Sequence, residues 1–206
     1  MGEISDRPLT EDDLDSDPLR LFERWFGEAA AHGAFEPHAV ALATATPDGR
    51  PSARMVLMKD FDEAGVVFFT NYASRKAAEL EANPQAALLF HWPELGRQVR
   101  IEGAVARVPR AETEAYARGR SRQSQLSALA SPQSSPVPSR EWLEQRVAEL
   151  DRQHRGAELP VREDWGGYRL APAAWEFWQH RPNRLHDRFR YLPDASGRWG
   201  IERLGP

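Results

Sequence analysis

The stretch AVALATATPDGRPSARMVLMKDFDEAGVVFFTN, residues 39–71, predicts the architecture of this chain. It contains three short runs rich in β-forming residues, separated by two turn signals. Links this short join antiparallel neighbours, whereas parallel strands need a crossover of about a dozen residues or more. The stretch therefore predicts an antiparallel meander. Its strands are Ala39–Thr46, Pro51–Phe61 and Val66–Asn71, and its turns are Pro47-Asp48-Gly49 and Asp62–Gly65.

Similar signals surround this meander, and together they predict a mainly β fold with helices. A helix should begin at Ser16 or Asp17, because a capping residue there precedes Pro18. Another short helix is expected over Ser74–Ala82, and residues 110–155 are polar and helical in pattern. Further strands are predicted at Ala86–Trp92, Gln98–Val108, Tyr168–Trp178, Arg184–Tyr191 and a last one ending at Leu204. We predict a single β-barrel domain over residues 17–206, decorated with helices and preceded by a mobile, charged segment 1–16.

Composition limits the possible partners. The 206 residues include 41% hydrophobic and 28% charged residues, which is ordinary for a globular domain. A net charge of −4 does not favour nucleic acid as a partner. The absence of cysteine excludes disulfides and thiolate chemistry. No run approaches the ~20 apolar residues that span a bilayer, and no secretion signal is visible, so a cytoplasmic protein without membrane contact is expected. No metal-ligand motif, glycine-rich phosphate loop or dinucleotide fingerprint is found.

The segment Arg54-Met55-Val56-Leu57-Met58-Lys59 places a cation at each end of an apolar run. The odd separation of Arg54 and Lys59 puts them on opposite faces of a regular strand. A bend or bulge would bring both side chains to one rim, where they could bind an anion. The alternative is that each cation reaches water at its own end of the strand.

Residues 70–76 predict a second anion site. A strand ends in a polar turn there, and Ser74 is placed to cap the next helix. Free backbone N–H groups and the helix dipole favour anions at a helix N-terminus, whereas Arg75 and Lys76 oppose the dipole. A bound phosphate would relieve that conflict. The alternative is an ordinary capped helix with solvated basic residues.

Two further segments gather cations. Arg184, His186 and Arg188 alternate, so in a predicted strand they share one face, where Arg forks can match phosphate or carboxylate oxygens. Three arginines also follow Tyr116 within residues 118–122, beside hydroxyl and amide side chains. An edge strand with a basic face toward solvent and a basic solvated loop are the respective alternatives. Several separate cationic and polar spots on a barrel suit one or two phosphorylated aromatic ligands.

The order and spacing of these motifs resemble the pyridoxamine 5′-phosphate oxidase family from about Asp17 to Pro206. The resemblance implies an FMN-binding split β-barrel that is homodimeric, with one FMN at each of two sites between subunits. It rests on Arg54–Lys59, Phe69-Thr70-Asn71, Ser74-Arg75-Lys76, Arg97-Gln98-Val99, Ser124-Gln125, Gln133-Ser134-Ser135, Trp175–Trp178 and Arg184–Phe189.

The resemblance also implies an activity and a set of site residues. Pyridoxine 5′-phosphate or pyridoxamine 5′-phosphate would give pyridoxal 5′-phosphate by hydride transfer from C4′ to flavin N5, and O2 would become hydrogen peroxide. Arg184 and His186 are expected to be the catalytic pair that lies against the pyridine ring. The expected cofactor-binding residues are Arg54, Met55, Val56, Leu57, Met58, Lys59, Phe69, Thr70, Arg75, Lys76, Gln98, Gln133, Ser134, Trp178 and Arg188. The expected substrate-binding residues are Lys59, Tyr116, Arg120, Ser124, Arg184, Leu185 and His186.

Two departures from the family pattern and two alternative functions remain. The N-terminal segment is acidic and lacks the Arg-x-x-Tyr type of segment that closes over the substrate in the family. The linker Gln179–Asn183 replaces a glycine-rich version.

A related flavin oxidase of another aromatic substrate, of the phenazine-biosynthesis type, is one alternative function, although it would not need Tyr116, Arg120 and Ser124. A non-catalytic FMN- or pyridoxal-phosphate-binding protein is the other.

Overall fold

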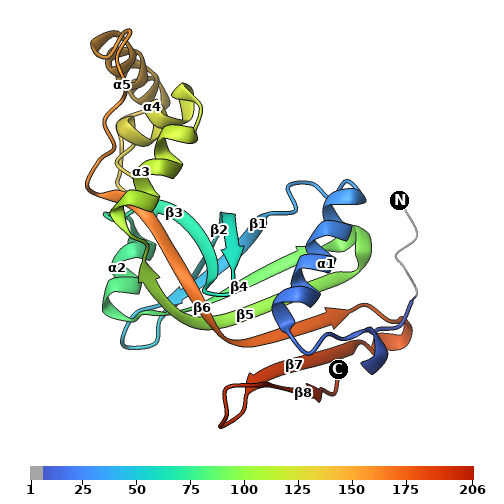
Figure 1. Ribbon diagram of the computed structural model, residues 1–206. Helices are drawn as coiled ribbons and strands as arrows, with labels where there is room; N and C mark the ends of the chain where they lie inside the picture. Colours follow the sequence, from blue (N-terminus) through green and yellow to red (C-terminus); the bar gives the residue numbers. More distant parts are fainter. Residues whose placement is uncertain (1–6) are drawn as a thin grey trace.

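The computed structural model describes residues 7–206, and these form one antiparallel sheet of eight strands. The strand order is β3-β2-β1-β4-β5-β6-β7-β8, and an additional pairing of β3 with β6 closes the first part of the sheet into a barrel. β7 and β8 continue the sheet beyond the barrel (Figure 1). The predicted split β-barrel is therefore confirmed. The strands are β1 (Ala39–Ala45), β2 (Pro51–Asp62), β3 (Gly65–Asn71), β4 (Gln85–Trp92), β5 (Arg97–Arg107), β6 (Trp165–Gln179), β7 (Asp187–Pro193) and β8 (Trp199–Arg203).

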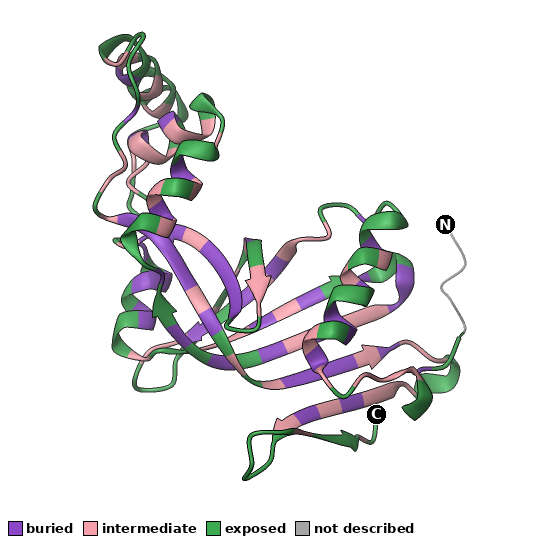
Figure 2. Cartoon of the chain, viewed as in Figure 1, coloured by how far each residue is buried: buried purple, intermediate pink, exposed green. Residues whose placement is uncertain are grey.

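Four of the five α-helices in residues 7–206 occupy two places around this sheet. One helix lies against the barrel, and three others form an arm that projects from it (Figure 1). The arm is mostly exposed in its outer part (Figure 2). No helix within residues 7–206 has both the length and the apolar character needed to cross a membrane. The barrel helix is α1 (Pro18–Ala31), the arm consists of α3 (Arg110–Gly119), α4 (Arg122–Ala130) and α5 (Arg140–Gln153), and α2 (Arg75–Ala82) links β3 to β4.

The meander forms as its sequence predicts. β1 pairs with β2 from Ala39 opposite Leu57 to Ala45 opposite Pro51, across the predicted turn at residues 47–49. Gly65 begins β3 with φ +129°, and a Cβ there would lie 2.0 Å from the carbonyl oxygen of Leu170 on β6. Only glycine fits this position, because the barrel closes there at a distance that leaves no room for a side chain.

α1 fills the core with aromatic side chains. Asp17 caps it by accepting a hydrogen bond from the Leu19 N–H at 3.0 Å, and Pro18 occupies the first turn, as predicted. Phe22 is fully buried, and its ring lies 5.0 Å from Phe90 and 5.5 Å from Trp175. Burying an aromatic side chain of this size stabilises the fold by about 1.5–3 kcal/mol. The helix is thereby fixed against β4 and β6.

The predicted strand from Arg184 to Tyr191 is wrong at its start. Residues Pro182–Arg184 form a short 3-10 turn, and β7 begins only at Asp187. Asn183 and Arg184 have φ values of +57° and +63°, which a β-strand cannot contain. The proline and these two left-handed residues interrupt the extended chain. Arg184, His186 and Arg188 therefore do not share one strand face, and the alternation inferred from the sequence does not hold.

The segment before α1 makes defined contacts as far as it is described. Leu9 is buried, and its N–H donates to Asp187 Oδ2 at 3.1 Å. Glu11 accepts two hydrogen bonds from the Arg203 guanidinium at 2.9 and 3.0 Å. Residues 7–16 thus lie against β7 and β8, which differs from the mobile segment expected over 1–16. Residues 1–6 of that expected segment lie outside the described residues.

Candidate active site

A bulge in β2 brings Arg54 and Lys59 to the same pocket. The pairing of β2 with β3 shifts register between Met58 and Asp60, so Lys59 occupies the irregular position. Both cations line a pocket of about 570 Å³. A bulge, one of the arrangements that their odd spacing left open, is therefore present. The Met58 side chain, in contrast, is buried in the core, so a ligand in the pocket would meet this residue only through its backbone.

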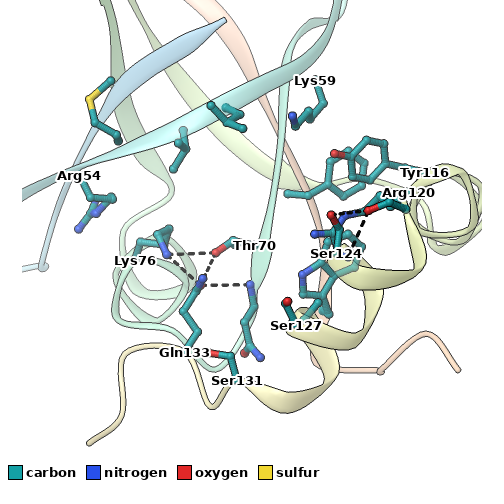
Figure 3. Close-up of a pocket in the computed structure, with 18 residues that line it drawn as sticks. Arg54, Lys59, Thr70, Lys76, Tyr116, Arg120, Ser124, Ser127, Ser131 and Gln133 are labelled. Atoms are coloured by element: carbon teal, nitrogen blue, oxygen red, sulfur yellow. Dashed lines mark hydrogen bonds between the residues drawn. The ribbon is translucent and has the colours of Figure 1, made fainter. Parts of the chain in front are cut away.

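Residues of β2, β3, α2, α3, α4, the loop after α4 and the start of β6 line the pocket. β2 and β3 form one wall, α3 and α4 form the opposite wall, and α2 and the loop after α4 form the floor (Figure 3). Met55 on β2 is 62% exposed, so this wall is open to solvent in the single chain. Twelve of the residues predicted from the sequence line the pocket, namely Arg54, Met55, Val56, Leu57, Lys59, Phe69, Thr70, Lys76, Tyr116, Arg120, Ser124 and Gln133.

Lys76 is a buried cation at the floor of the pocket. Its Nζ donates to Thr70 Oγ1 at 3.1 Å and to Gln133 Oε1 at 3.0 Å (Figure 3). Burial lowers the pKa of Lys76, and the positive charge of Arg54 lowers it further, while Glu79 partly opposes the shift. The ammonium is held here by neutral oxygens, so the charge on Lys76 remains available to an anionic ligand.

The expected cap of α2 is absent. Ser74 occupies the N-cap position, but its side chain makes no capping hydrogen bond. Its hydroxyl instead accepts from Lys76 Nζ at 3.4 Å. This side chain therefore faces the pocket cation, and the backbone N–H groups of the first turn lack the hydroxyl that would cap them.

Stacked aromatic rings form the wall beside two further cations of the pocket, Lys59 and Arg120. The Phe69 and Tyr116 rings lie 3.9 Å apart, and Trp165 stacks on Phe69 at 5.5 Å. The guanidinium of Arg120 lies 5.0 Å from the centre of the Trp165 ring, so a cation–π contact holds it at the pocket. Burial lowers the pKa of Lys59, and the nearby charge of Arg120 lowers it further. Tyr116, Arg120 and Ser124 thus meet Lys59 at one end of the pocket.

Some lining residues were not predicted from the sequence. Trp165 carries the clearest signal in retrospect, because a large aromatic residue stands directly before a Gly-Gly pair. A Cβ at Gly167 would lie 2.9 Å from the Phe69 ring, so the glycine leaves room for the stacked rings. The other lining residues outside the predicted set are Asn71, Ser121, Ser127, Ala128 and Ser131. Asn71 belongs to the motif Phe69-Thr70-Asn71, and the other four are small or polar residues without a comparable signal.

A second cluster of predicted residues lies at the other end of β6. Gln98, Trp178 and Arg188 are direct register partners across β5, β6 and β7, so they form one row on one face of the sheet. The His186 ring lies 4.5 Å from the Trp178 ring. Its Nδ1 accepts the backbone N–H of Arg181 at 3.1 Å, which leaves Nε2 as the nitrogen that carries the proton and can face a ligand.

The two clusters do not meet within one chain. Trp165 opens β6 and Trp178 lies near its other end, so at about 3.3 Å per residue they are about 40 Å apart along the strand (Figure 1). None of the described residues of the second cluster lines the pocket. Leu185 is 70% exposed beside Arg184 and His186. The second cluster is therefore far from its own chain's pocket.

Two remaining predicted residues lie near the pocket without lining it. Arg75 begins α2, and its Nε donates to Glu79 at 2.8 Å. Ser134 follows the lining residue Gln133 and has φ +68°. Within residues 7–206 no group of histidine and acidic side chains could hold a metal ion.

Fold and pocket together define a split β-barrel with paired cations for anionic ligands. Two family profiles match the chain: "Pyridoxamine 5′-phosphate oxidase" over residues 28–154 and "Pyridoxine 5′-phosphate oxidase C-terminal dimerisation region" over residues 165–206. The chain is 57% identical to the pyridoxine/pyridoxamine 5′-phosphate oxidase of Rubrobacter xylanophilus, over 96% of this chain and 91% of that protein. It is 55% identical to the enzyme of the same name from Ralstonia pickettii, over 94% and 91%. The chain belongs to the pyridoxine/pyridoxamine 5′-phosphate oxidase family.

Solved structures share the same fold. PhzG from Burkholderia lata 383, solved in complex with tetrahydrophenazine-1-carboxylic acid, has a TM-score of 0.90 and 38% identity over 96% of this chain and 98% of that chain. A pyridoxamine 5′-phosphate oxidase-related, FMN-binding protein from Nostoc punctiforme has a TM-score of 0.72 at 19% identity, over 92% of this chain and 98% of that one, and supports the fold alone.

Proposed function

We propose that this chain is an FMN-dependent oxidase that converts pyridoxine 5′-phosphate and pyridoxamine 5′-phosphate to pyridoxal 5′-phosphate, with O2 reduced to hydrogen peroxide. The identity of 57% and 55% to two enzymes of that name supports the activity. The single structural observation that carries the proposal is the pair of cationic subsites in one pocket, Arg54 with Lys76 and Lys59 with Arg120. Two phosphorylated ligands, one cofactor and one substrate, would each need one such subsite.

The first subsite fits the phosphate of FMN. Lys76 is buried among neutral oxygens, and burial together with the charge of Arg54 lowers its pKa. A phosphate carries about −1.5 to −2 charges at neutral pH. Binding it beside Lys76 and Arg54 would relieve the cost of keeping these charges together and out of water. Arg75 and the N-terminus of α2 would contribute from the same side.

The second subsite fits the phosphate of the substrate. Lys59, Tyr116, Arg120 and Ser124 converge at the end of the pocket next to the stacked rings. Burial and the charge of Arg120 lower the pKa of Lys59, so an anion would again offset unfavourable charge. A substrate without a phosphate would leave these polar groups without a partner in the complex. The free energy of binding would then be less favourable than in a site that never contained these groups.

A second copy of the chain would complete each site. Arg184 and His186 belong to the cluster that lies far from its own chain's pocket, together with Trp178 and Arg188. In the proposed homodimer, this cluster lies over the partner's pocket, so that Arg184 and His186 contact the pyridine ring while Gln98, Trp178 and Arg188 contact the cofactor. The family profile over residues 165–206, named for dimerisation, covers most of this cluster.

The residues of this chain would contribute position and charge. FMN, when bound, supplies the electron chemistry of the oxidation. Arg184 would hold the substrate ring at the reacting distance of about 3–3.5 Å. The hydrogen bond from Arg181 fixes the His186 ring and leaves its Nε2 toward the polar edge of the substrate. Because the described pocket is lined by no carboxylate, we expect the protein to act by binding and orientation rather than by a strong general base.

One observation favours a second candidate function. The structural similarity to PhzG, with a TM-score of 0.90, makes a related oxidase of an unphosphorylated aromatic substrate the alternative. Lys59 and Arg120 distinguish the two candidate functions, because they form a subsite for a phosphate. A tetrahydrophenazine carboxylate has no phosphate that could occupy this subsite.

An oxidase assay tests the proposal. The purified protein, saturated with FMN under air, should form aldehyde absorbance and peroxide in equal amounts when pyridoxine 5′-phosphate is added. Unphosphorylated pyridoxine is the matched control, and it should react far more slowly. Turnover of a tetrahydrophenazine carboxylate without turnover of either phosphorylated vitamer would favour the alternative. Bound flavin that neither vitamer reduces would overturn the oxidase proposal.

A further inference from the structure

Glu79 is a buried carboxylate directly behind the first cationic subsite. It lies on α2, it is 5% exposed, and it accepts hydrogen bonds from four side chains. Burying a charge without partners would be very costly, so these donors account for its presence. The donors are Thr44 Oγ1 and Ser52 Oγ, both at 2.5 Å, Arg75 Nε at 2.8 Å and a terminal nitrogen of Arg54 at 3.2 Å.

The same network fixes the direction of Arg54. One terminal nitrogen of its guanidinium donates to Thr44 Oγ1 at 2.6 Å and to the Leu42 carbonyl at 3.1 Å. The other nitrogen donates to Ser52 and to Glu79. Thr44 and Ser52 therefore join the carboxylate and the guanidinium into one unit, which leaves Arg54 little freedom to turn away from the pocket.

Arg75 depends on Glu79 in a different way. Its side chain is 65% exposed, and Glu79 lies one helical turn further along α2. A long exposed side chain samples many rotamers, and a charge-assisted hydrogen bond to a buried acceptor selects among them. Glu79 thus holds the Arg75 side chain along α2, on the helix face that carries the carboxylate.

The charges of this group match a phosphate. Arg54, Arg75 and Lys76 carry three positive charges, and Glu79 carries one negative charge, so the group has a net charge near +2. Hydrogen bonds from Ser52, Thr44, Arg75 and Arg54 outweigh the opposing effect of burial and lower the pKa of Glu79 to about 2, so it is ionised at neutral pH. Without Glu79, three cations would repel one another at the same end of the pocket.

We propose that Glu79 is a positioning residue for the phosphate end of the cofactor: it holds the Arg54 and Arg75 guanidiniums in the orientation that receives the phosphate, and it does not contact the ligand itself. This inference rests on the proposed FMN-dependent function. It concerns a residue outside the set expected from the family resemblance and outside the residues that line the pocket.

A comparison of FMN with riboflavin tests this role, because riboflavin has the same ring system and lacks the phosphate. Full-length protein freed of flavin is titrated with each ligand, and quenching of flavin fluorescence gives the dissociation constants. Glu79→Gln keeps the size of the side chain and removes its charge. We expect its FMN dissociation constant to rise about tenfold, the scale of one hydrogen bond between charged groups, while the riboflavin constant stays unchanged.

Glu81→Gln is the matched control, since Glu81 lies on the same helix and pairs at 2.8 Å with Arg107 outside the pocket. It should leave both dissociation constants unchanged. If Glu79→Gln fails to fold, Ser52→Ala removes one donor to Glu79 and one acceptor of Arg54. That variant should show a smaller loss, of about threefold, again only for FMN.

Each other outcome has a distinct meaning. Equal weakening of FMN and riboflavin would assign Glu79 a general structural role and overturn the proposal. Unchanged or tighter FMN binding in Glu79→Gln would overturn it as well, since the carboxylate would then be neutral toward the phosphate or repel it. A wild-type protein that binds riboflavin as tightly as FMN would instead contradict the phosphate subsite in the proposed function.

Discussion

The two halves of the candidate site differ in how completely a single chain assembles them. The pocket between β2, β3 and the α3–α4 arm brings together cations from distant parts of the sequence, and neighbours fix several of them, as Thr70 and Gln133 fix Lys76. The second cluster lies on the outer part of the sheet, with Leu185 exposed and Arg184 in a left-handed turn. The difference teaches that one chain can build a pocket while the groups proposed to orient a substrate lie in a separate part of the sheet.

Arg184→Ala gives the largest expected effect and separates the two halves. Turnover should fall about hundredfold, because the substrate ring would lose the group that holds it at the reacting distance, while FMN affinity stays within about threefold. Steady-state kinetics and flavin titration measure the two quantities. Arg190→Ala is the control, because Arg190 lies on β7, the strand that follows the turn of Arg184, and pairs with Glu202 at 2.6 Å. Equal losses of turnover and flavin affinity would mean that Arg184 acts on the flavin and not on the substrate ring.

Within the pocket, Lys76→Met should weaken FMN binding by up to about a hundredfold, because it removes a buried charge from the phosphate subsite. Arg75→Ala should cost about fivefold or less, since the Arg75 side chain is 65% exposed and its charge is better screened. Flavin fluorescence titration ranks the two variants. The reverse ranking would mean that the cofactor phosphate lies at the surface of α2 and away from the floor of the pocket.

The stacked wall predicts a smaller effect on the substrate alone. Trp165→Leu removes the ring that holds Arg120, so KM for pyridoxine 5′-phosphate should rise about threefold to fivefold with little change in kcat. Trp142→Leu on α5, where the tryptophan is 37% exposed, is the control and should change neither constant. A fall in kcat with an unchanged KM would show that the wall orients the reacting ring rather than the phosphate.

The smallest expected effect is a pH dependence of substrate binding. Burial and Arg120 lower the pKa of Lys59 below its usual 10.5 in the free protein. A bound phosphate favours the protonated form and raises that pKa, so affinity should decline as pH rises through the lowered value. KM, measured from neutral pH to about pH 10, should therefore begin to rise at a lower pH than it would if Lys59 had the pKa of an ordinary lysine. Lys59→Arg should flatten this rise, and an unchanged profile in that variant would remove Lys59 from the substrate subsite.

Much of the barrel could be predicted because its signals are local. The turn at residues 47–49 and the β-rich runs on either side of it specify a hairpin without reference to the rest of the chain. The closure of β3 on β6 was not visible in the same way, since it depends on contacts between residues about a hundred positions apart. Gly65 permits that closure, but the sequence pattern indicates only that this glycine belongs to a turn.

The pocket could be predicted from spacing and family resemblance, whereas the geometry of the second cluster could not. Arg184, His186 and Arg188 alternate as in a strand, but the positive φ angles of Asn183 and Arg184 follow from a turn that local propensity does not reveal. The contacts of Leu9 and Glu11 with the last strands also join the two ends of the chain, and nothing in the acidic segment itself indicates them.

The central claim is that one chain's pocket and another chain's second cluster form each active site, and mixed dimers test it most directly. Arg120→Ala alters the pocket, and Arg184→Ala alters the second cluster, so each variant alone should be nearly inactive. A heterodimer of the two would contain one site with both halves intact, and its turnover should recover to about half that of the wild-type dimer. A purified heterodimer that is no more active than either parent would contradict the claim, because both halves would then have to come from the same chain.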